Sequence, residues 1–161
     1  MFVGFLLLCS FAYAAWSAAP WVPTKKHDVE RARNLLALRA GETVYELGCG
    51  DARMCLALAQ DGARAVGIEL SFLQWLAAKI RARNREDVEI RLANLYRHDL
   101  SQADAVYMFL MPEVYKKLCP KFERELKPGS RVVSYVWPIE GWEPTVKDEK
   151  EGAPNLYLYL R

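Results

Sequence analysis

The pattern of hydrophobic and polar positions divides the chain into an apolar N-terminal run followed by alternating strands and helices. Strands are predicted over five segments, residues 43–47, 64–70, 88–92, 104–110 and 131–137. Helices are predicted over residues 28–38, 51–60, 71–84 and 112–126. We expect Asp28 to cap the first of these helices and Pro120 to split the last one. Strands that alternate with helices are typical of an α/β domain with a mostly parallel sheet covered on both faces.

The C-terminal part follows a different pattern. Residues 142–147 and 156–160 read as two strands with only a loop between them. A loop connection suits an antiparallel pair, because parallel neighbours need a long crossover. We therefore expect this pair at one edge of the sheet.

The N-terminal run, residues 2–19, contains only apolar and small residues, and no charged residue precedes Lys25. As a helix it would reach roughly 27 Å, close to the ~30 Å hydrocarbon core of a bilayer. We expect a transmembrane anchor with a Pro-rich linker over residues 1–24 and a globular domain over residues 25–161. Basic residues follow the run directly, so the positive-inside tendency predicts a single-pass protein whose domain faces the cytoplasm or the inner compartment of an organelle.

Two alternatives exist for the same run. A cleaved signal peptide is disfavoured because no positive residues precede the run, and because Pro20 follows the plausible cleavage site. A buried or interfacial helix is disfavoured because a small domain rarely offers a fully buried place to a helix that is apolar on every side.

Composition and charge narrow the functional class. The 161 residues are 52% hydrophobic and 26% charged, which suits one folded domain with a real core. The net charge of +2 is too small for a nucleic-acid footprint, so no nucleic-acid partner is expected. The four cysteines lack metal-ligand spacing, so we expect reduced thiols and no metal site.

A glycine turn, Gly48-Cys49-Gly50-Asp51, joins the first predicted strand of the domain to the next helix. In open α/β sheets, ligands bind beyond the carboxyl ends of the strands, and glycine there leaves the backbone bare. A dinucleotide fingerprint would need a third glycine where Arg53 stands, and Asp51 would repel a pyrophosphate. A ligand with a cationic ammonium group suits Asp51 better, and S-adenosylmethionine carries one.

The next two strand ends add compatible side chains. Glu69 lies nineteen residues after Gly50, where a carboxylate can accept both ribose hydroxyls. Asn94 could read the adenine edge, with Leu95 and Tyr96 as an apolar bed for the ring. Each signal has an ordinary structural explanation, as a tight connection, a solvated acid or a turn residue. Their succession at three strand ends nevertheless favours a cofactor site.

The segments ELGCGDAR, GIEL and ANLY resemble the first three cofactor motifs of the seven-stranded S-adenosylmethionine-dependent methyltransferases. With APWVPT, DAVYMFLMP and LKPGSRVVSYVWPIEGWEP, the chain is similar to the small membrane-anchored protein-lysine methyltransferases. Mitochondrial members of that group modify the ATP synthase c subunit and the adenine nucleotide translocase. The resemblance implies a Rossmann-like doubly wound sheet of order 3-2-1-4-5-7-6 with the last strand antiparallel. It also implies cofactor-binding roles for Glu46, Gly48, Gly50, Asp51, Glu69 and Asn94. Many relatives have glycine where Ala52 stands, and we expect little consequence.

The chemistry of lysine methylation predicts the rest of the site. A lysine attacks only as the free amine, and its usual pKa near 10.4 calls for a dry, apolar pocket and a proton acceptor. Residues 106–112 (VYMFLMP) could form the apolar wall of this pocket, and Glu113 and Tyr115 are the candidate proton acceptors. Glu113 equally suits an ordinary first-turn helix position.

Three further segments bear on the substrate and the proton acceptor. His98 and Asp99 could form a general-base pair or a solvated loop. Tyr135 and Trp137 could wall a substrate channel or pack in the core. Leu110-Met111-Pro112-Glu113 lacks the Asn/Asp-Pro-Pro-aromatic motif, which disfavours DNA adenine as the substrate.

The sequence therefore predicts a membrane-anchored methyltransferase that moves a methyl group from S-adenosylmethionine to a lysine ε-amine of a protein, most simply a membrane protein. One alternative is a small-molecule methyltransferase that acts on a lipophilic substrate. Another is a non-catalytic module that binds the cofactor.

Overall fold

The computed structural model describes residues 24–161. The anchor expected over residues 2–19 lies outside the described residues. Among residues 24–161, no helix combines the length and apolar character that a bilayer crossing requires.

The domain is built on a seven-stranded sheet of order β3-β2-β1-β4-β5-β7-β6. The strands are β1 (Thr43–Leu47), β2 (Arg64–Glu69), β3 (Val88–Leu92), β4 (Ala105–Met108), β5 (Arg131–Tyr135), β6 (Val146–Asp148) and β7 (Leu156–Leu160). Neighbours from β3 to β5 pair in parallel, whereas β7 is antiparallel to both β5 and β6. The predicted strand order and the antiparallel edge pair are confirmed.

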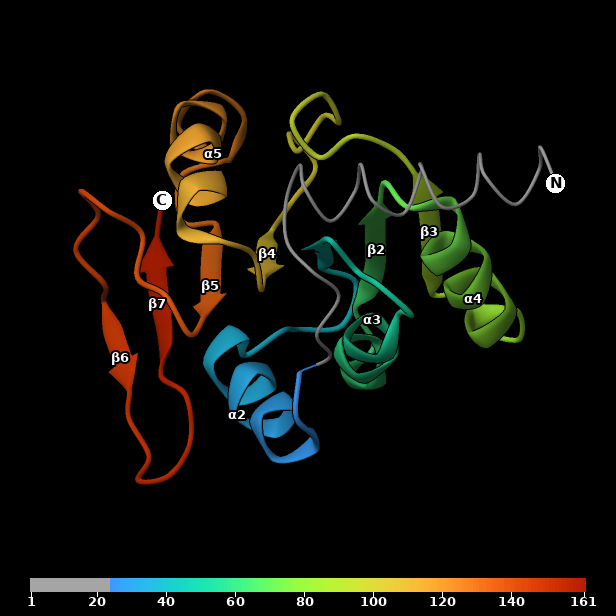
Figure 1. Ribbon diagram of the computed structural model, residues 1–161, viewed down its shortest axis with the longest axis horizontal. Coiled ribbons are helices and arrows are strands. Elements are labelled where there is room, and N and C mark those ends of the chain that lie inside the picture. The colour runs from blue at the N-terminus through green and yellow to red at the C-terminus, as the bar shows by residue number, and fades with distance from the viewer. Residues whose placement is uncertain (1–23) are drawn as a thin grey trace, which may run out of the picture.

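Helices cover both faces of this sheet (Figure 1). They are α2 (Lys26–Leu36), α3 (Arg53–Leu58), which continues as the short 3-10 helix η1 (Ala59–Asp61), α4 (Phe72–Ala82) and α5 (Pro112–Glu125). Buried residues of α2, α3 and α4 share one hydrophobic core, and those of α5 belong to a second core on the opposite face. Strand β4 alternates between them, since Tyr107 points into the first core and Val106 and Met108 into the second.

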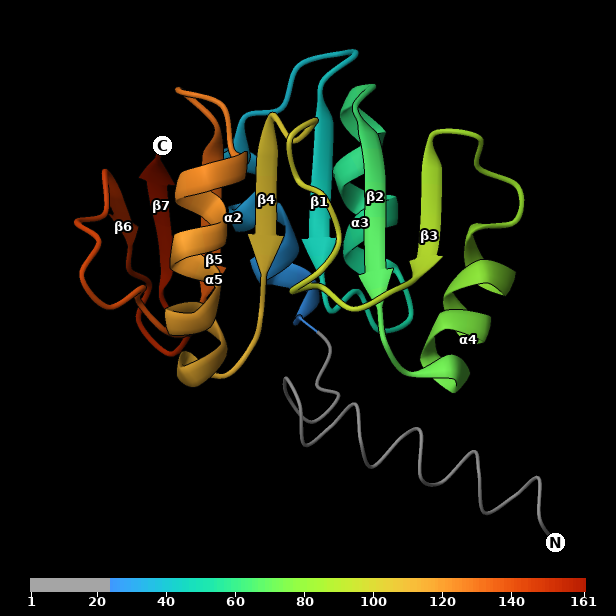
Figure 2. The same ribbon diagram turned by 90° about the horizontal axis from the view of Figure 1, so that it is seen from above.

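The parallel strands β1 to β4 run in one direction, and their carboxyl ends meet along one edge of the sheet (Figure 2). Helices α4 and α5 begin at the same edge, because each follows a strand that ends there. This edge is where an open α/β sheet binds its ligand.

The expected break at Pro120 is wrong, because α5 runs without interruption from Pro112 to Glu125. Leu118 and Phe122 are fully buried on either side of Pro120. Pro120 itself is exposed, so water can satisfy the carbonyl that loses its partner. Burial of the apolar face therefore outweighs the roughly 3 kcal/mol cost of an internal proline.

The expected cap at Asp28 is also wrong. Helix α2 begins at Lys26 after Lys25, and Asp28 lies inside its first turn. Its carboxylate bonds to side chains that include one from another element instead of to the helix backbone.

The remaining differences are shifts of element ends. Helix α3 begins at Arg53 because Ala52 has a left-handed backbone, with φ of 64°. Strand β4 ends at Met108, two residues before the predicted end. The strand predicted over residues 142–147 starts later than expected, because β6 begins only at Val146. The Trp142 ring packs instead against Phe122 and Tyr159.

Candidate active site

The glycine turn leaves β1 and immediately bonds to the end of the neighbouring strand. The N–H groups of Gly48 and Cys49 both donate to the Ile68 carbonyl, at 2.9 and 3.0 Å. Gly48 has φ of 76°, and a Cβ at this position would lie 2.8 Å from Leu110 Cδ2. The backbone angle favours glycine at this position, and any side chain here would also require the Leu110 methyl group to shift.

Ala52 closes the turn in the same left-handed region, with φ of 64°. A residue with a Cβ pays roughly 1–2 kcal/mol for this conformation, so replacing the glycine of many relatives does have a local energetic cost. The expectation of little consequence for the site stays a prediction. The side chain of Ala52 is fully buried, and that burial partly offsets the cost.

Glu69 reaches from the end of β2 into this turn. One carboxylate oxygen accepts the Gly50 N–H at 2.9 Å, and the other accepts the N–H groups of Leu70 and Ser71 at 2.9 and 2.8 Å. Burial raises the pKa of Glu69 above its usual range, although the three N–H donors oppose that shift. Glu69 therefore fixes the glycine turn against the start of α4, and its bond to ribose hydroxyls stays a prediction.

Glu46 lies under the turn, buried between the sheet and α3. Its Oε2 accepts the backbone N–H of Cys55 at 2.8 Å and the Cys55 thiol at 2.9 Å. Burial raises the pKa of Glu46 to about 8, helped by the nearby carboxylates of Asp51 and Glu69. The carboxyl is therefore mostly protonated at neutral pH, and a cation placed beside it would favour its ionised form.

Asp51 is a buried carboxylate that already faces cations. Its Oδ2 accepts bonds from Arg53 Nε at 2.7 Å and from an Arg81 terminal nitrogen at 2.8 Å. Both guanidinium groups are about half exposed, while the Asp51 side chain is 9% exposed. This arrangement suits a cationic ligand group, which could replace a guanidinium that water readily solvates.

Asn94 and Leu95 occupy the third strand end in a different way. Asn94 Oδ1 accepts the Tyr96 N–H at 2.9 Å, so this side chain stabilises a turn after β3. Leu95 is 6% exposed and belongs to the second core. The Ala93 N–H donates to the Glu69 carbonyl at 2.9 Å, which brings this turn next to the ribose-binding candidate. Adenine recognition by Asn94 and Leu95 stays a prediction.

A small cavity of about 40 Å³ opens at the glycine turn. Its lining includes Glu46, Gly48, Gly50 and Asp51, together with Thr24 and Phe109. Four of the seven predicted cofactor residues therefore line one cavity. Glu69 does not line it but accepts a hydrogen bond from Gly50, which does.

The two candidate proton acceptors differ sharply in exposure. Glu113 is exposed in the first turn of α5. Tyr115 is 1% exposed, and its hydroxyl donates to the Tyr135 carbonyl and accepts the Leu110 N–H, both at 3.3 Å. Burial also raises the pKa of Tyr115. Tyr115 is therefore placed to support the loop after β4, and this position does not favour proton acceptance from a substrate.

The remaining candidate residues divide between core and loop roles. His98 contacts Arg91 at 3.0 Å, whereas Asp99 bonds to Ser101, as in an ordinary loop. Tyr135 is buried and packs edge-on against Phe109, with ring centroids 4.7 Å apart. Trp137 is 44% exposed at the end of β5.

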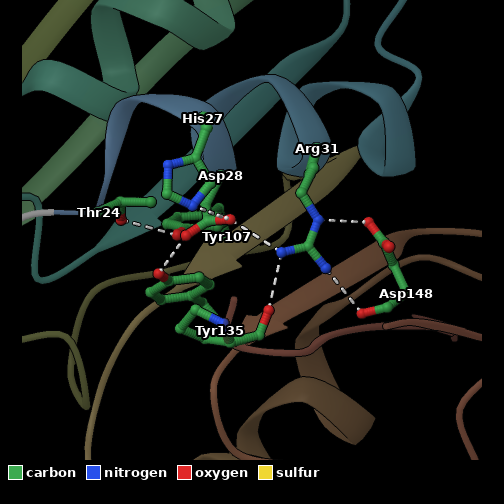
Figure 3. A network of polar contacts seen from close by, with 8 residues as sticks. Thr24, His27, Asp28, Arg31, Tyr107, Tyr135 and Asp148 are labelled. Atoms are coloured by element: carbon green, nitrogen blue, oxygen red, sulfur yellow. Dashed lines mark hydrogen bonds and ion pairs between the residues drawn. The ribbon is translucent and has the colours of Figure 1, made fainter. Parts of the chain in front are cut away.

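Sequence reasoning missed a polar network beside the site, centred on Asp28 (Figure 3). Asp28 is fully buried and accepts bonds from the Tyr135 hydroxyl at 2.7 Å and from Arg31 at 2.8 Å. Burial by itself raises the pKa of Asp28, but these hydrogen bonds outweigh it and hold the pKa below its usual value. Arg31 also bonds to Asp148 at 3.1 Å, which links α2 to β6. The i, i+3 spacing of Asp28 and Arg31 was visible in the sequence, but the partners from distant strands were not.

The same region holds the first described residue of the chain. The hydroxyls of Thr24 and Tyr107 share a hydrogen bond of 2.9 Å (Figure 3). Because Thr24 also lines the cavity at the glycine turn, the chain enters the domain at its candidate active site.

Comparison with known proteins gives this geometry a context. The family model of the ANTKMT methyltransferase domain matches residues 46–146. A protein-lysine N-methyltransferase of Saccharolobus islandicus is 37% identical over 147 residues, which cover 88% of this chain and 91% of the relative. The adenine nucleotide translocase lysine N-methyltransferase of Mus musculus is 35% identical over 146 residues, with 87% of this chain and 62% of the relative covered. This chain thus spans less than two thirds of the mouse protein.

Solved structures show the same likeness. The crystal structure of an RNA methyltransferase from Salinibacter ruber in complex with S-adenosyl-L-homocysteine superposes with a TM-score of 0.83 and 34% identity. The match covers 86% of this chain and 93% of that one. The resemblance inferred from the sequence motifs is confirmed, as is S-adenosylmethionine as the cofactor.

Proposed function

The chain belongs to the ANTKMT methyltransferase domain family, and on that premise we propose that it methylates the ε-amino group of lysine in a protein, using S-adenosylmethionine. The likeness to the archaeal protein-lysine N-methyltransferase carries this proposal, because it extends over nearly all of both chains. The residues of the site are consistent with it.

The residues at the glycine turn fit the cofactor. Gly48 and Gly50 leave bare backbone, and a Cβ at Gly48 would collide with Leu110. Asp51 and Glu46 are buried carboxyl groups beside this turn. The ammonium group of the cofactor could pair with Asp51, and a cation there would favour the ionised form of Glu46. Glu69 offers oxygens beside Gly50 to ribose hydroxyls.

When bound, S-adenosylmethionine supplies a methyl group activated by a positive sulfonium. The protein has to bring a neutral lysine amine in line with that group and keep water away. Phe109 lines the cavity and Met111 follows it in the loop after β4, so both can provide the apolar approach. Glu113, exposed in the first turn of α5, is the candidate that accepts the lysine proton.

We also propose that residues 2–19 anchor the domain to a membrane and that the target is a membrane protein. The apolar run supports the anchor by its length, and the entry of the chain at Thr24 beside the cavity supports a site that faces the membrane. A tether of this kind raises the effective concentration of membrane neighbours. By the positive-inside tendency the domain lies in the cytoplasm or an organelle's inner compartment.

The proposal is tested by incubating the full chain and its native membranes with methyl-tritiated S-adenosylmethionine, then separating protein, RNA and lipid. Label in protein, located on lysine by mass spectrometry and absent with Glu69→Ala, is the expected result. Label in lipid would support a small-molecule methyltransferase, and label in RNA would support the activity described for the Salinibacter protein. Cofactor binding without any transfer would support a non-catalytic module.

A further inference from the structure

Large apolar side chains are exposed mainly along one edge of the domain. Among residues 24–161, nine such side chains are exposed, and six of them lie at or after the carboxyl ends of β2, β3, β4 and β5. We call these six the apolar rim: Phe72, Leu73, Leu76, Leu92, Met111 and Trp137. Their exposed fractions lie between 39% and 47%. This is the edge that carries the candidate active site (Figure 2).

Helix α4 shows most clearly that large apolar side chains lie on the surface of the domain and not in its core. Its buried residues are the small Ala78 and Ala82, whereas Phe72, Leu76 and Ile80 point outward with four-residue spacing. A helix that only covers a sheet normally buries its large apolar residues and exposes its polar ones. Apolar side chains that gather on a surface mark a site of interaction with a protein or a membrane.

Basic residues accompany the rim. Lys79 and Arg81 lie in the last turn of α4, the helix that carries three residues of the rim, and Arg83 follows directly. The Arg81 guanidinium also pairs with Asp51. Lys25 and Lys26 are exposed where the chain enters the domain. Apolar side chains flanked by lysine and arginine are typical of helices that lie in the interface of an anionic bilayer.

The attachment point of the N-terminal segment favours a bilayer over other partners. Thr24 lines the active-site cavity, so the segment that contains the apolar run joins the domain at the edge that bears the rim. A membrane-spanning tether at this point would hold this edge, and no other, against the lipid surface.

We propose that the apolar rim docks into the interface of an anionic lipid bilayer and turns the active site towards the membrane surface. The target lysine then lies at the level of the lipid headgroups. This proposal rests on the membrane anchor of the proposed function, but not on the identity of the target.

The test uses the full chain, with Cys9 and Cys119 replaced by serine, in vesicles of phosphatidylcholine and phosphatidylglycerol. A fluorophore is attached at Leu76→Cys on the rim or, as a control, at Gln60→Cys, which is exposed near the start of β2 at the opposite edge. Lipids that carry a quencher in the headgroup region should quench the Leu76 label several-fold more than the Gln60 label. Pure phosphatidylcholine should weaken this difference.

The outcomes separate this proposal from the anchor. If the chain sediments with the vesicles but both labels are quenched equally, the docking proposal fails and the anchor stands. If the chain does not sediment with vesicles, both fail. Docking would also be overturned if the Leu76 label were protected from the lipid quencher only at high protein concentration, or only when membrane proteins are added. The first result would indicate a second copy on the rim, and the second a protein partner.

A second measurement uses activity. Phe72→Ser combined with Leu76→Ser should lower methyl transfer to the membrane target several-fold while the affinity for S-adenosylmethionine in solution is unchanged. Val146→Ser is the matched control, because Val146 is 40% exposed on β6, away from the rim. Equal transfer by the rim variant and the control would contradict the proposal.

Discussion

Replacing Glu69 by glutamine should weaken cofactor binding without abolishing the fold. The carboxylate accepts backbone N–H groups on both of its oxygens, from Gly50 on one and from Leu70 and Ser71 on the other. Glutamine keeps one acceptor oxygen and places an NH₂ group where the second was. If the oxygen stays with Leu70 and Ser71, the NH₂ group faces the Gly50 N–H, so that two donors oppose each other.

The size of the effect follows from the bonds that are lost. A hydrogen bond to a charged group contributes about 1.5–3 kcal/mol, so the turn loses roughly that stability in the variant. The ribose hydroxyls lose one charged acceptor as well. A loss of about 1.5–3 kcal/mol corresponds to roughly 10- to 150-fold weaker binding of S-adenosylmethionine.

Isothermal titration calorimetry of the full chain measures this affinity, and thermal unfolding checks that the variant folds. Glu89→Gln is the matched control, because Glu89 lies on the neighbouring strand β3 and pairs with Arg91 and Arg64 away from the turn. The control should bind the cofactor like the wild type. A folded Glu69→Gln variant with wild-type affinity would refute the assignment of Glu69 to the ribose.

Three other substitutions test neighbouring parts of the structure. The pKa of Glu46 is about 8 in the folded chain, against the usual 4.5, so between these pH values the folded carboxyl keeps a proton that the unfolded carboxyl has lost. Its contribution to the free energy of unfolding is therefore complete below about pH 4.5 and is lost as the pH rises towards 8. Glu46→Gln should remove this pH-dependent loss of stability, which is at most about 1.4 kcal/mol per pH unit. Urea unfolding of the cofactor-free chain at several pH values measures it, and the same pH dependence in the variant would contradict the raised pKa. Gly67→Ala places a Cβ 2.7 Å from Cys49 Sγ and should cost about 1–3 kcal/mol of unfolding free energy, whereas a wild-type melting temperature would mean that the buried thiols move aside. Tyr135→Phe removes the hydroxyl that donates to Asp28 and should cost about 1.5–3 kcal/mol in urea unfolding; no loss would show that the network adds little to stability.

Much of the fold could be predicted because local pattern and tertiary structure agree. Strands β1 and β2 are short and largely apolar, and the edge strand β3 alternates apolar with charged residues. The predicted positions of all three hold to within a residue. The predictions of a break at Pro120 and of a cap at Asp28 failed because tertiary packing decides the outcome at both positions. Local helix signals carry no information about Phe122 packing or about a Tyr135 hydroxyl from another strand.

The site was predictable to the extent that strand ends converge. The Glu69 contact with Gly50 follows from two adjacent parallel strands that end together. The pairing of Asp51 with Arg81 could not be foreseen, because it depends on how α4 lies across the turn. The burial of Tyr115 was hidden for a similar reason, since only the packing of α5 decides which of its faces meets the sheet.

A crystal structure of the full chain with S-adenosyl-L-homocysteine tests the central claim most directly. We predict that the ribose hydroxyls bond to the Glu69 carboxylate and that the amino acid portion lies against the backbone from Gly48 to Asp51. Ligand density at any other place, or none at saturating concentration, would contradict the account.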